Sequence, residues 1–191
     1  MDADRITLCG EESFGTGSSH VREKDGLWAV LFWLNLIAAL SKPARTILRE
    51  HWQRYGRDYF TRHDYEAVDA DKAAALMEAV RERLPELPGQ CLGGHTVQAA
   101  DDFCYTDPVD GSVSAGQGLR ILFADGARIV YRLSGTGTAG ATLRVYYDSY
   151  QRDPALLELA PQRALATLIA AGDELAGISR LLGRTQPDVI T

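Results

Sequence analysis

Two arginines bracket a glycine-rich segment in the second half of the chain, which reads RLSGTGTAGATLR from Arg132 to Arg144. Glycines let backbone N–H groups converge on an anion, the hydroxyls of Ser134 and Thr136 add donors, and guanidinium forks match phosphate oxygens. The segment lacks the GxxxxGK[ST] spacing of a Walker loop, and no helix pattern follows it directly. On composition alone, phosphate binding and a plain hairpin connection fit about equally well.

A second polar loop follows the first expected strand and begins GEESFGTG at Gly10. The carboxylate of Glu11 and the hydroxyl of Ser13 can accept from and donate to sugar hydroxyls, and α/β folds place ligand sites where strands end. Lys24 brings a cationic group to the same polar stretch. A solvated loop that leads into a helix is the alternative interpretation of these residues.

Composition and charge narrow the classes of protein that fit. The chain has 191 residues, enough for one large or two small domains, and 46% of them are hydrophobic, so it can bury a core. Its net charge of −6 argues against non-specific nucleic-acid binding, which needs a basic field. The three cysteines form no CxxC pair and no zinc spacing, so we expect a reduced, cytoplasmic protein.

The apolar stretches predict no membrane segment. The longest of them, 27–40, is interrupted by Asn35 and is shorter than the roughly 20 residues that a spanning helix needs. We therefore interpret it as a buried helix of a soluble protein. The first residues carry no basic segment followed by an apolar run, so no secretory signal is expected.

The first quarter of the chain has the order strand, loop, helix. The segment 5–9 is β-branched and apolar, a polar loop follows, and Asp25 can cap a helix over 26–40 that stops before Pro43. One such unit cannot bury both sides of its strand, so residues 1–45 are interpreted as the incomplete end of an α/β domain. Residues 46–66 show no clean period and are interpreted as a hinge or connector.

Residues 67–191 carry signals for both helices and antiparallel strands. A helix is expected from Asp69, and Asp125-Gly126 predicts a hairpin between 119–124 and 128–133. A strand over 142–147 follows, then a helix that ends near residue 182, with Gly172 and Gly177 weakening its continuity. The predicted class is a small α+β domain, an antiparallel sheet with helices.

Taken together, four segments resemble the eukaryotic-type phosphoglucomutases of the α-D-phosphohexomutase superfamily. They are CGEESFGTGSSHVREKDGLWAVLFWL at 9–34, YGRDYFTRHDYE at 55–66, YTDPVDGSVSAGQGLRILFADGARIVYRLSGTGTAGATLRVYYDSY at 105–150, and GRTQPDVIT at 183–191. Their order and spacing resemble those of the family over nearly the whole chain, which is more specific than one glycine-rich loop.

The resemblance implies roles for particular residues. The GEES motif contacts the sugar hydroxyls, which gives Glu11 and Ser13, and the lysine of REKDG contacts the bound sugar phosphate, which gives Lys24. A lysine there can either stabilise charge near the reacting oxygen or assist proton transfer. The glycine-rich loop grips the phosphate that is not transferred, which gives Arg132, Ser134, Gly135, Thr136 and Arg144. Thr138 replaces an expected serine, and Ser19 replaces an expected aspartate.

The resemblance also implies parts that this sequence lacks. Family members carry a TASH-like loop with a phosphoserine and a DGDGDR-like loop that binds Mg²⁺, and neither motif occurs in the 191 residues. The chain would then hold the end of the third domain and all of the fourth, with neither a catalytic serine nor a metal site. The missing N-terminal domains of the same protein would be its partner and would bind Mg²⁺.

The implied parent enzyme interconverts glucose 1-phosphate and glucose 6-phosphate through glucose 1,6-bisphosphate, and the chain alone is expected to be inactive. Two alternatives stay open: a non-catalytic relative of the family, and a mutase for mannose or N-acetylglucosamine phosphate. The GEES motif favours glucose. An apolar helix without a complete domain around it also predicts self-association of the chain.

Overall fold

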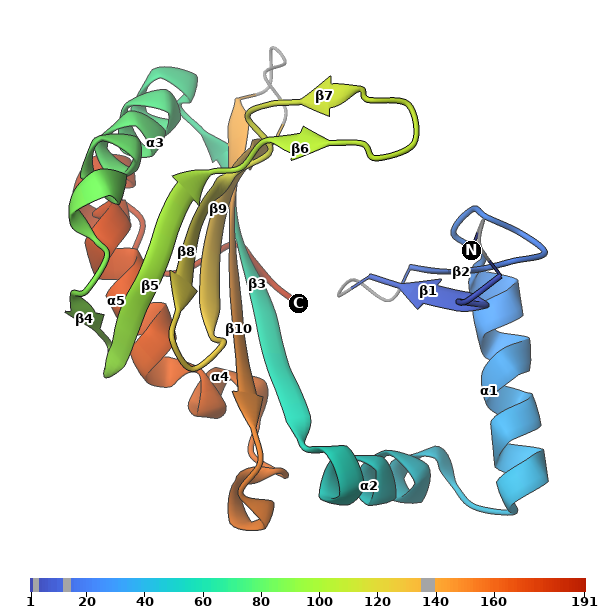
Figure 1. Cartoon of the computed structure of the whole chain (residues 1–191). Helices are drawn as coiled ribbons and strands as arrows, with labels where there is room; N and C mark the ends of the chain where they lie inside the picture. The colour runs from blue at the N-terminus through green and yellow to red at the C-terminus, as the bar shows by residue number, and fades with distance from the viewer. Residues whose placement is uncertain (2–3, 12–14, 135–139) are drawn as a thin grey trace. The chain divides into compact units, whose positions relative to one another are not determined.

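The computed structural model describes residues 1, 4–11, 15–134 and 140–191 of the chain. The chain divides into two compact units, Met1–Gly56 and Arg57–Thr191 (Figure 1). The boundary at Gly56 differs from the predicted division into 1–45, a connector at 46–66, and 67–191.

The first unit holds a short hairpin and two helices. Strand β1 (Leu8–Gly10) pairs antiparallel with β2 (Thr16–Ser18), and helices α1 (Gly26–Leu40) and α2 (Ala44–Tyr55) follow. The predicted helix over 26–40 is confirmed, because the Asp25 carboxylate accepts a hydrogen bond from the Trp28 backbone N–H at 3.0 Å. The predicted strand at 5–9 lies later, at 8–10, and its partner β2 lies inside the segment that was expected to be a loop.

Helix α1 has no buried residue, although its sequence is almost wholly apolar. The side chain of Leu27 is 80% exposed, and Val30, Leu31 and Leu34 are exposed as well. The prediction that this helix is buried is wrong for this chain, because a hairpin of two three-residue strands and one charged helix offer it too little apolar surface.

No single helix among the described residues is both long and apolar enough to cross a membrane. Helices α1 and α2 are long and apolar enough only when they are taken together, and they are bent by 82° relative to each other.

The second unit is built on an antiparallel sheet with the strand order β11-β3-β10-β9-β8-β5-β4. Its strands are β3 (Arg57–Val68), β4 (Cys91–Leu92), β5 (His95–Asp102), β8 (Leu119–Phe123), β9 (Arg128–Ser134), β10 (Ala141–Gln151) and β11 (Val189–Ile190). A separate hairpin joins β6 (Tyr105–Thr106) to β7 (Val113–Ser114). The helices are α3 (Ala70–Arg83), α4 (Pro161–Ala164), α5 (Ala166–Ala176) and α6 (Ile178–Leu182), with 3-10 turns at Leu84–Glu86 and Pro154–Leu156.

Within the second unit, the described helices α3 and α5 cover one face of the sheet (Figure 1). Figure 1 shows α3 and α5 together on one side of the strands. Along β10, Leu143, Val145 and Tyr147 are fully buried toward these helices, while Arg144 and Tyr146 alternate with them and are half-buried. Alternation of period two therefore separates an apolar core from a polar face. The predicted α+β class is confirmed.

Several predicted elements are also confirmed. Helix α3 begins after Asp69, whose carboxylate accepts from the Lys72 backbone N–H at 3.0 Å, and it buries Leu76 and Val80 among others. The Asp125-Gly126 turn joins β8 and β9 in the expected hairpin.

The segment predicted to be a connector is helix α2 followed by strand β3, which lies between β11 and β10. Strand β3 is not apparent from the sequence because both faces of the strand carry polar residues. On the covered face the ring of His63 bonds Gln162 at 3.0 Å, and on the other face Arg62 bonds Asp64. These polar groups are buried with partners, so the strand lacks the alternation of apolar and polar residues that sequence patterns detect.

Helix α5 approaches the sheet closely at Gly172. A Cβ at this position would lie 2.6 Å from Cε1 of Tyr147 and 3.3 Å from Cδ1 of Ile129. The Tyr147 hydroxyl donates to Asp173 Oδ1 at 2.6 Å, so the ring cannot move aside freely. Gly172 therefore stays inside the helix for packing, whereas Gly177 adopts the left-handed conformation and ends it.

We expect Gly172→Ala to destabilise the second unit. Overpacking a core costs about 1–3 kcal/mol, against about 1 kcal/mol gained from helix propensity. The Tyr147 ring is held by its hydrogen bond and cannot move to relieve the overlap. Urea unfolding followed by far-UV circular dichroism should show a lower midpoint.

Gly26→Ala is the matched control, because a Cβ there meets nothing within 4 Å. All three tryptophans lie in the first unit, so their fluorescence should not respond to Gly172→Ala. An unchanged midpoint for Gly172→Ala would contradict the packing account.

Candidate functional site

The two arginines that flank the glycine-rich segment lie directly opposite each other on neighbouring strands. The register of β9 with β10 pairs Arg132 with Arg144, and the strands stay paired as far as Ser134 and Thr142. Opposed residues on one face have Cβ atoms about 4.5–5.5 Å apart, and like charges in such positions destabilise a sheet. The arrangement therefore favours an anion between the two guanidinium groups.

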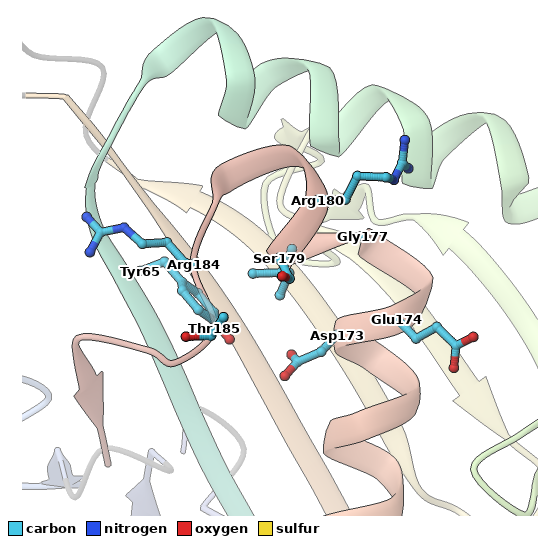
Figure 2. A pocket seen from close by; sticks show the side chains of 9 residues that line it. Tyr65, Asp173, Glu174, Gly177, Ser179, Arg180, Arg184 and Thr185 are labelled. Carbon is cyan, nitrogen blue, oxygen red and sulfur yellow. The ribbon is translucent and has the colours of Figure 1, made fainter.

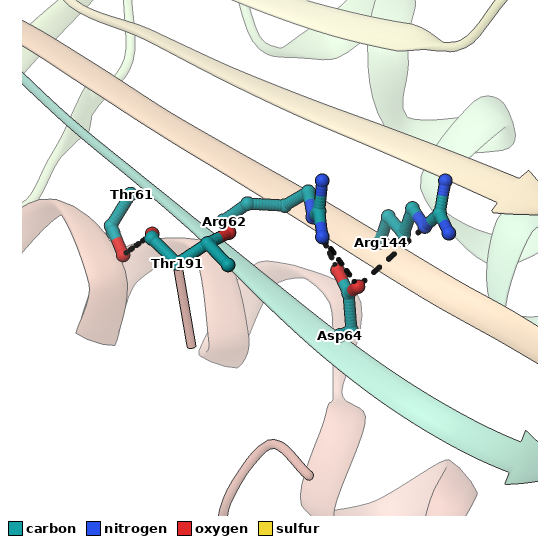
Figure 3. Close-up of polar contacts among 5 residues, drawn as sticks. All are labelled: Thr61, Arg62, Asp64, Arg144 and Thr191. Carbon is teal, nitrogen blue, oxygen red and sulfur yellow. Dashed lines mark hydrogen bonds and ion pairs between the residues drawn. The ribbon is translucent and has the colours of Figure 1, made fainter. Parts of the chain in front are cut away.

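The same row continues to a buried carboxylate on β3. Asp64 is the partner of Arg144 in the β3–β10 register, and its side chain is only 4% exposed. Arg62 binds it through two hydrogen bonds, Nε to Oδ1 at 2.8 Å and Nη2 to Oδ2 at 3.0 Å. Arg144 Nε lies 3.6 Å from Oδ2 (Figure 3). The row thus reads Arg132, Arg144, Asp64 across three strands.

A glycine makes room for the Arg132 side chain. Gly118 has φ +143°, and a Cβ there would lie 2.8 Å from Cγ of Arg132 and 3.0 Å from the Tyr131 carbonyl oxygen. Arg132 also lines a cavity of about 370 Å³ together with Gly118, Arg81 and Asp102. Arg81 is ion-paired with Asp102 there, Nε to Oδ2 at 2.9 Å, and this hydrogen bond raises the pKa of the guanidinium.

Part of the predicted phosphate loop lies outside the described residues. This is the case for Gly135, Thr136 and Thr138, so their roles stay predictions. Ser134 is described and ends β9, half-buried. The structure thus places the two arginines and Ser134 at the end of one hairpin.

The first unit brings together two of the three predicted sugar contacts. Lys24 Nζ lies 2.6 Å from Glu11 Oε2, and both side chains are exposed. The backbone N–H of Glu11 donates to the carbonyl of Gly15 at 2.8 Å, and a Cβ at Gly15 would lie 2.9 Å from Cδ of Lys24. A glycine at this turn therefore lets the lysine cross over to the carboxylate. Ser13, the third predicted contact, lies outside the described residues.

A groove of about 450 Å³ adjoins this pair. It is lined by Glu11 and Thr16 from the hairpin and by Ala29, Val30, Trp33 and Leu34 from α1. A carboxylate beside an indole and aliphatic side chains can bind a hydroxyl-rich ligand that also has apolar C–H faces.

A further cavity of about 550 Å³ lies on the helix-covered side of the second unit, around α5 and α6. Figure 2 shows its arginines, Arg180 and Arg184, at opposite sides, so they do not form a paired anion clamp. Burial raises the pKa of the Asp173 carboxyl in its wall. This cavity was not predicted from the sequence.

The sequence interpretation also missed Asp64, Arg62 and Gly118. The signal for the first two was an arginine and an aspartate two residues apart, which share one face of a strand. Among the residues that the structure describes, no group of three or more His, Cys, Asp or Glu side chains is arranged to hold a metal ion.

Comparison with known families matches each unit separately. The model of the phosphoglucomutase-1 C-terminal domain matches residues 57–188, and that of the phosphoglucomutase/phosphomannomutase alpha/beta/alpha domain III matches residues 1–55. The boundary between the two matches coincides with the division between the two units.

Whole-sequence and structural comparisons agree with these matches. The chain is 58% identical over 191 residues to a phosphoglucomutase of Rhizobium radiobacter and 51% identical over 197 residues to human phosphoglucomutase-1, covering 100% of this chain and 35% of each relative. The open form of the Paramecium exocytosis-sensitive phosphoprotein pp63/parafusin, a phosphoglucomutase, superposes with a TM-score of 0.87 at 44% identity, over 100% of this chain and 34% of that one. The chain spans about a third of the length of these relatives, and it belongs to the phosphoglucomutase family, of which it represents the C-terminal part.

Proposed function

We propose that the chain is the sugar-phosphate-binding part of a phosphoglucomutase that interconverts glucose 1-phosphate and glucose 6-phosphate. The observation that carries this proposal is the pair Arg132 and Arg144, directly opposed on one face of the sheet. Two facing guanidinium groups need a counter-charge, and a phosphate dianion supplies one with the geometry that arginine forks prefer.

The roles proposed for the residues follow from what phosphoryl transfer requires. Phosphoryl transfer asks a protein chiefly for positioning and charge stabilisation. In the proposal, Arg132, Ser134 and Arg144 hold the phosphate that is not transferred, with Gly135 and Thr136 completing the loop. In the same proposal, Glu11 and Ser13 bind sugar hydroxyls, and Lys24, which is ion-paired with Glu11, contacts the phosphorylated sugar.

The reaction proposed for the complete enzyme proceeds through glucose 1,6-bisphosphate and uses Mg²⁺. Both the phosphoserine and the metal are assigned to the part of the enzyme that this sequence does not contain, since the chain has neither the TASH-like nor the DGDGDR-like motif. The residues present here contribute binding and orientation, and the metal would stabilise charge on the transferring phosphoryl group.

Arg132→Ala in the complete enzyme should weaken binding of every phosphorylated sugar. A hydrogen bond to a charged group contributes roughly 1.5–3 kcal/mol, so we expect a loss of about one to two decades in affinity for inorganic phosphate and for glucose 1-phosphate alike. Arg128→Ala is the matched control, because Arg128 lies on the same strand and face but is paired with Asp148. Equal effects of both variants would contradict a specific role for Arg132.

Glu11→Gln should affect sugar discrimination and leave inorganic phosphate binding unchanged. The amide keeps the shape of the carboxylate but turns one acceptor into a donor toward sugar hydroxyls, and it removes the charge that pairs with Lys24. The measurement compares glucose 1-phosphate, mannose 1-phosphate and inorganic phosphate as competitive ligands. If inorganic phosphate weakens as much as the sugars, the roles of the two loops are wrongly assigned.

The chain alone should show no mutase activity. Its sequence contains no phosphoryl carrier of the family type, and without a carrier no phosphoryl group can be passed between the sugar ends. A coupled assay for glucose 6-phosphate checks this, with the Arg132→Ala chain purified in parallel to control for host enzyme. Turnover by the wild-type chain above that control would overturn the expectation.

We also propose that the exposed face of α1 drives self-association of the isolated chain, since large apolar patches rarely stay bare in water. Leu27→Glu should restore a monomer in sedimentation velocity. An acidic residue in the first turn of a helix is favourable, so the substitution should keep α1 intact. Val109→Glu is the control, because Val109 is 85% exposed in the β6–β7 hairpin. A monomeric wild-type chain would contradict the proposal.

A further inference from the structure

We propose that Asp64 is a positioning residue that fixes the guanidinium of Arg144 for phosphate binding. The inference rests on the proposed function of the arginine pair and adds a residue from β3, outside the glycine-rich segment. Asp64 is assigned no contact with the phosphate, and it acts through Arg144.

The contact between Asp64 and Arg144 is an electrostatic one, and it involves only the Nε edge of the guanidinium. Arg144 Nε is buried and has no hydrogen-bond partner among the residues that the structure describes, and Asp64 Oδ2 lies 3.6 Å from it, beyond hydrogen-bond distance. Figure 3 shows the terminal nitrogens of Arg144 directed away from the carboxylate. The carboxylate therefore attracts the Nε edge of the guanidinium and leaves the outer edge for an anion.

Asp64 is itself held rigidly. Its carboxylate is almost wholly buried, and Arg62 on the same strand grips it with two hydrogen bonds at 2.8 and 3.0 Å. A buried carboxylate with this bidentate partner cannot rotate away, so it offers a fixed point of negative charge. Arg62 also neutralises the charge of Asp64. The group of Arg62, Asp64 and Arg144 therefore keeps one net positive charge, which attracts an anion.

Arg144 is attracted by Asp64 and repelled by Arg132, and for this reason Asp64 can determine the position of its guanidinium. Arg132 opposes Arg144 on one side, and Asp64 opposes it on the other. Without the carboxylate, Arg144 would be repelled from Arg132 and free to explore other rotamers. Ordering such a side chain on binding costs about 0.5–1.5 kcal/mol, which corresponds to about a two- to tenfold loss of affinity.

Removing the Asp64 carboxylate also has a second effect, which strengthens phosphate binding. The experiment must separate this effect from the loss of positioning. The loss of one negative charge strengthens the long-range attraction of an anion, whatever Arg144 does. That effect is screened by salt, with a Debye length of about 4 Å near 0.5 M, whereas the loss of positioning is not. Binding should therefore be measured at about 0.5 M NaCl.

The test is a double-mutant cycle on the 191-residue chain, with inorganic phosphate and glucose 1-phosphate as the probes. The chains are wild type, Asp64→Asn, Arg144→Ala and the double variant. We expect Asp64→Asn to weaken binding about two- to tenfold in the wild-type background and to have no effect when Arg144 is already alanine. An equal loss in both backgrounds would overturn the proposal, because Asp64 would then act independently of Arg144.

Asp101→Asn is the matched control. Asp101 on β5 makes a similar two-bond pair with Arg120 on β8, at 2.8 and 2.7 Å, and this pairing lowers the pKa of the carboxyl. This substitution removes an arginine-bound carboxylate from the same sheet, at a more exposed position, without touching the arginine pair. Phosphate affinity should be unchanged. A loss as large as that of Asp64→Asn would show a general effect of sheet stability and overturn the proposal.

A second variant keeps the proposal testable if Asp64→Asn does not fold. Arg144→Lys retains the charge at a half-exposed position but has no Nε for Asp64 to hold. We expect its affinity to fall to that of Arg144→Ala, and wild-type affinity would overturn the proposal. If Arg144→Ala itself binds phosphate normally, the proposed function of the loop fails. If Arg144→Ala binds weakly while Asp64→Asn and Arg144→Lys bind normally, only the positioning role fails.

Discussion

The opposition of Arg132 and Arg144 across β9 and β10 is the constraint on which the candidate site depends. It exists only in one register, since a shift of β10 by one residue would turn Arg144 toward α3 and α5 and leave Arg132 on the other face. The register is set by the covered face, where Leu143, Val145 and Tyr147 alternate with the polar residues and are fully buried. The apolar core therefore determines where the charges lie.

Burying Asp64 beside this pair carries a penalty that the structure offsets locally. A desolvated carboxylate is strongly unfavourable unless hydrogen bonds and opposite charge surround it. Two hydrogen bonds from Arg62 meet that requirement, and backbone pairing with β11 covers the strand edge beside it. The end of the chain contributes here, because the Thr191 carbonyl accepts from the Arg62 backbone N–H at 2.9 Å and from Thr61 Oγ1 at 2.8 Å (Figure 3).

Sequence patterns predicted those parts of the fold where local chemistry and burial agree. Helix α3 and the Asp125-Gly126 hairpin have caps or turn residues at the right places and apolar residues on one face, so their placement followed directly. Strand β3 was missed because His63 and Asp64 are both buried, on opposite faces, and their partners come from distant or neighbouring polar residues. The arginine pair could be predicted from its flanking positions. Its support from Asp64 and Gly118 could not, because it arises from pairing between strands.

The two units differ in how fully each buries its own apolar residues. All members of the hydrophobic core cluster lie between Tyr59 and Ile178, so the arginine pair stands on a core that is complete within its own unit. Helix α1, which lines the groove beside Glu11, buries none of its residues. The geometry around Glu11 and Lys24 therefore rests on a hairpin and an ion pair between exposed side chains, and exposed pairs contribute little stability. The proposed phosphate site therefore depends less on the first unit than the proposed sugar contacts of Glu11 and Lys24 do.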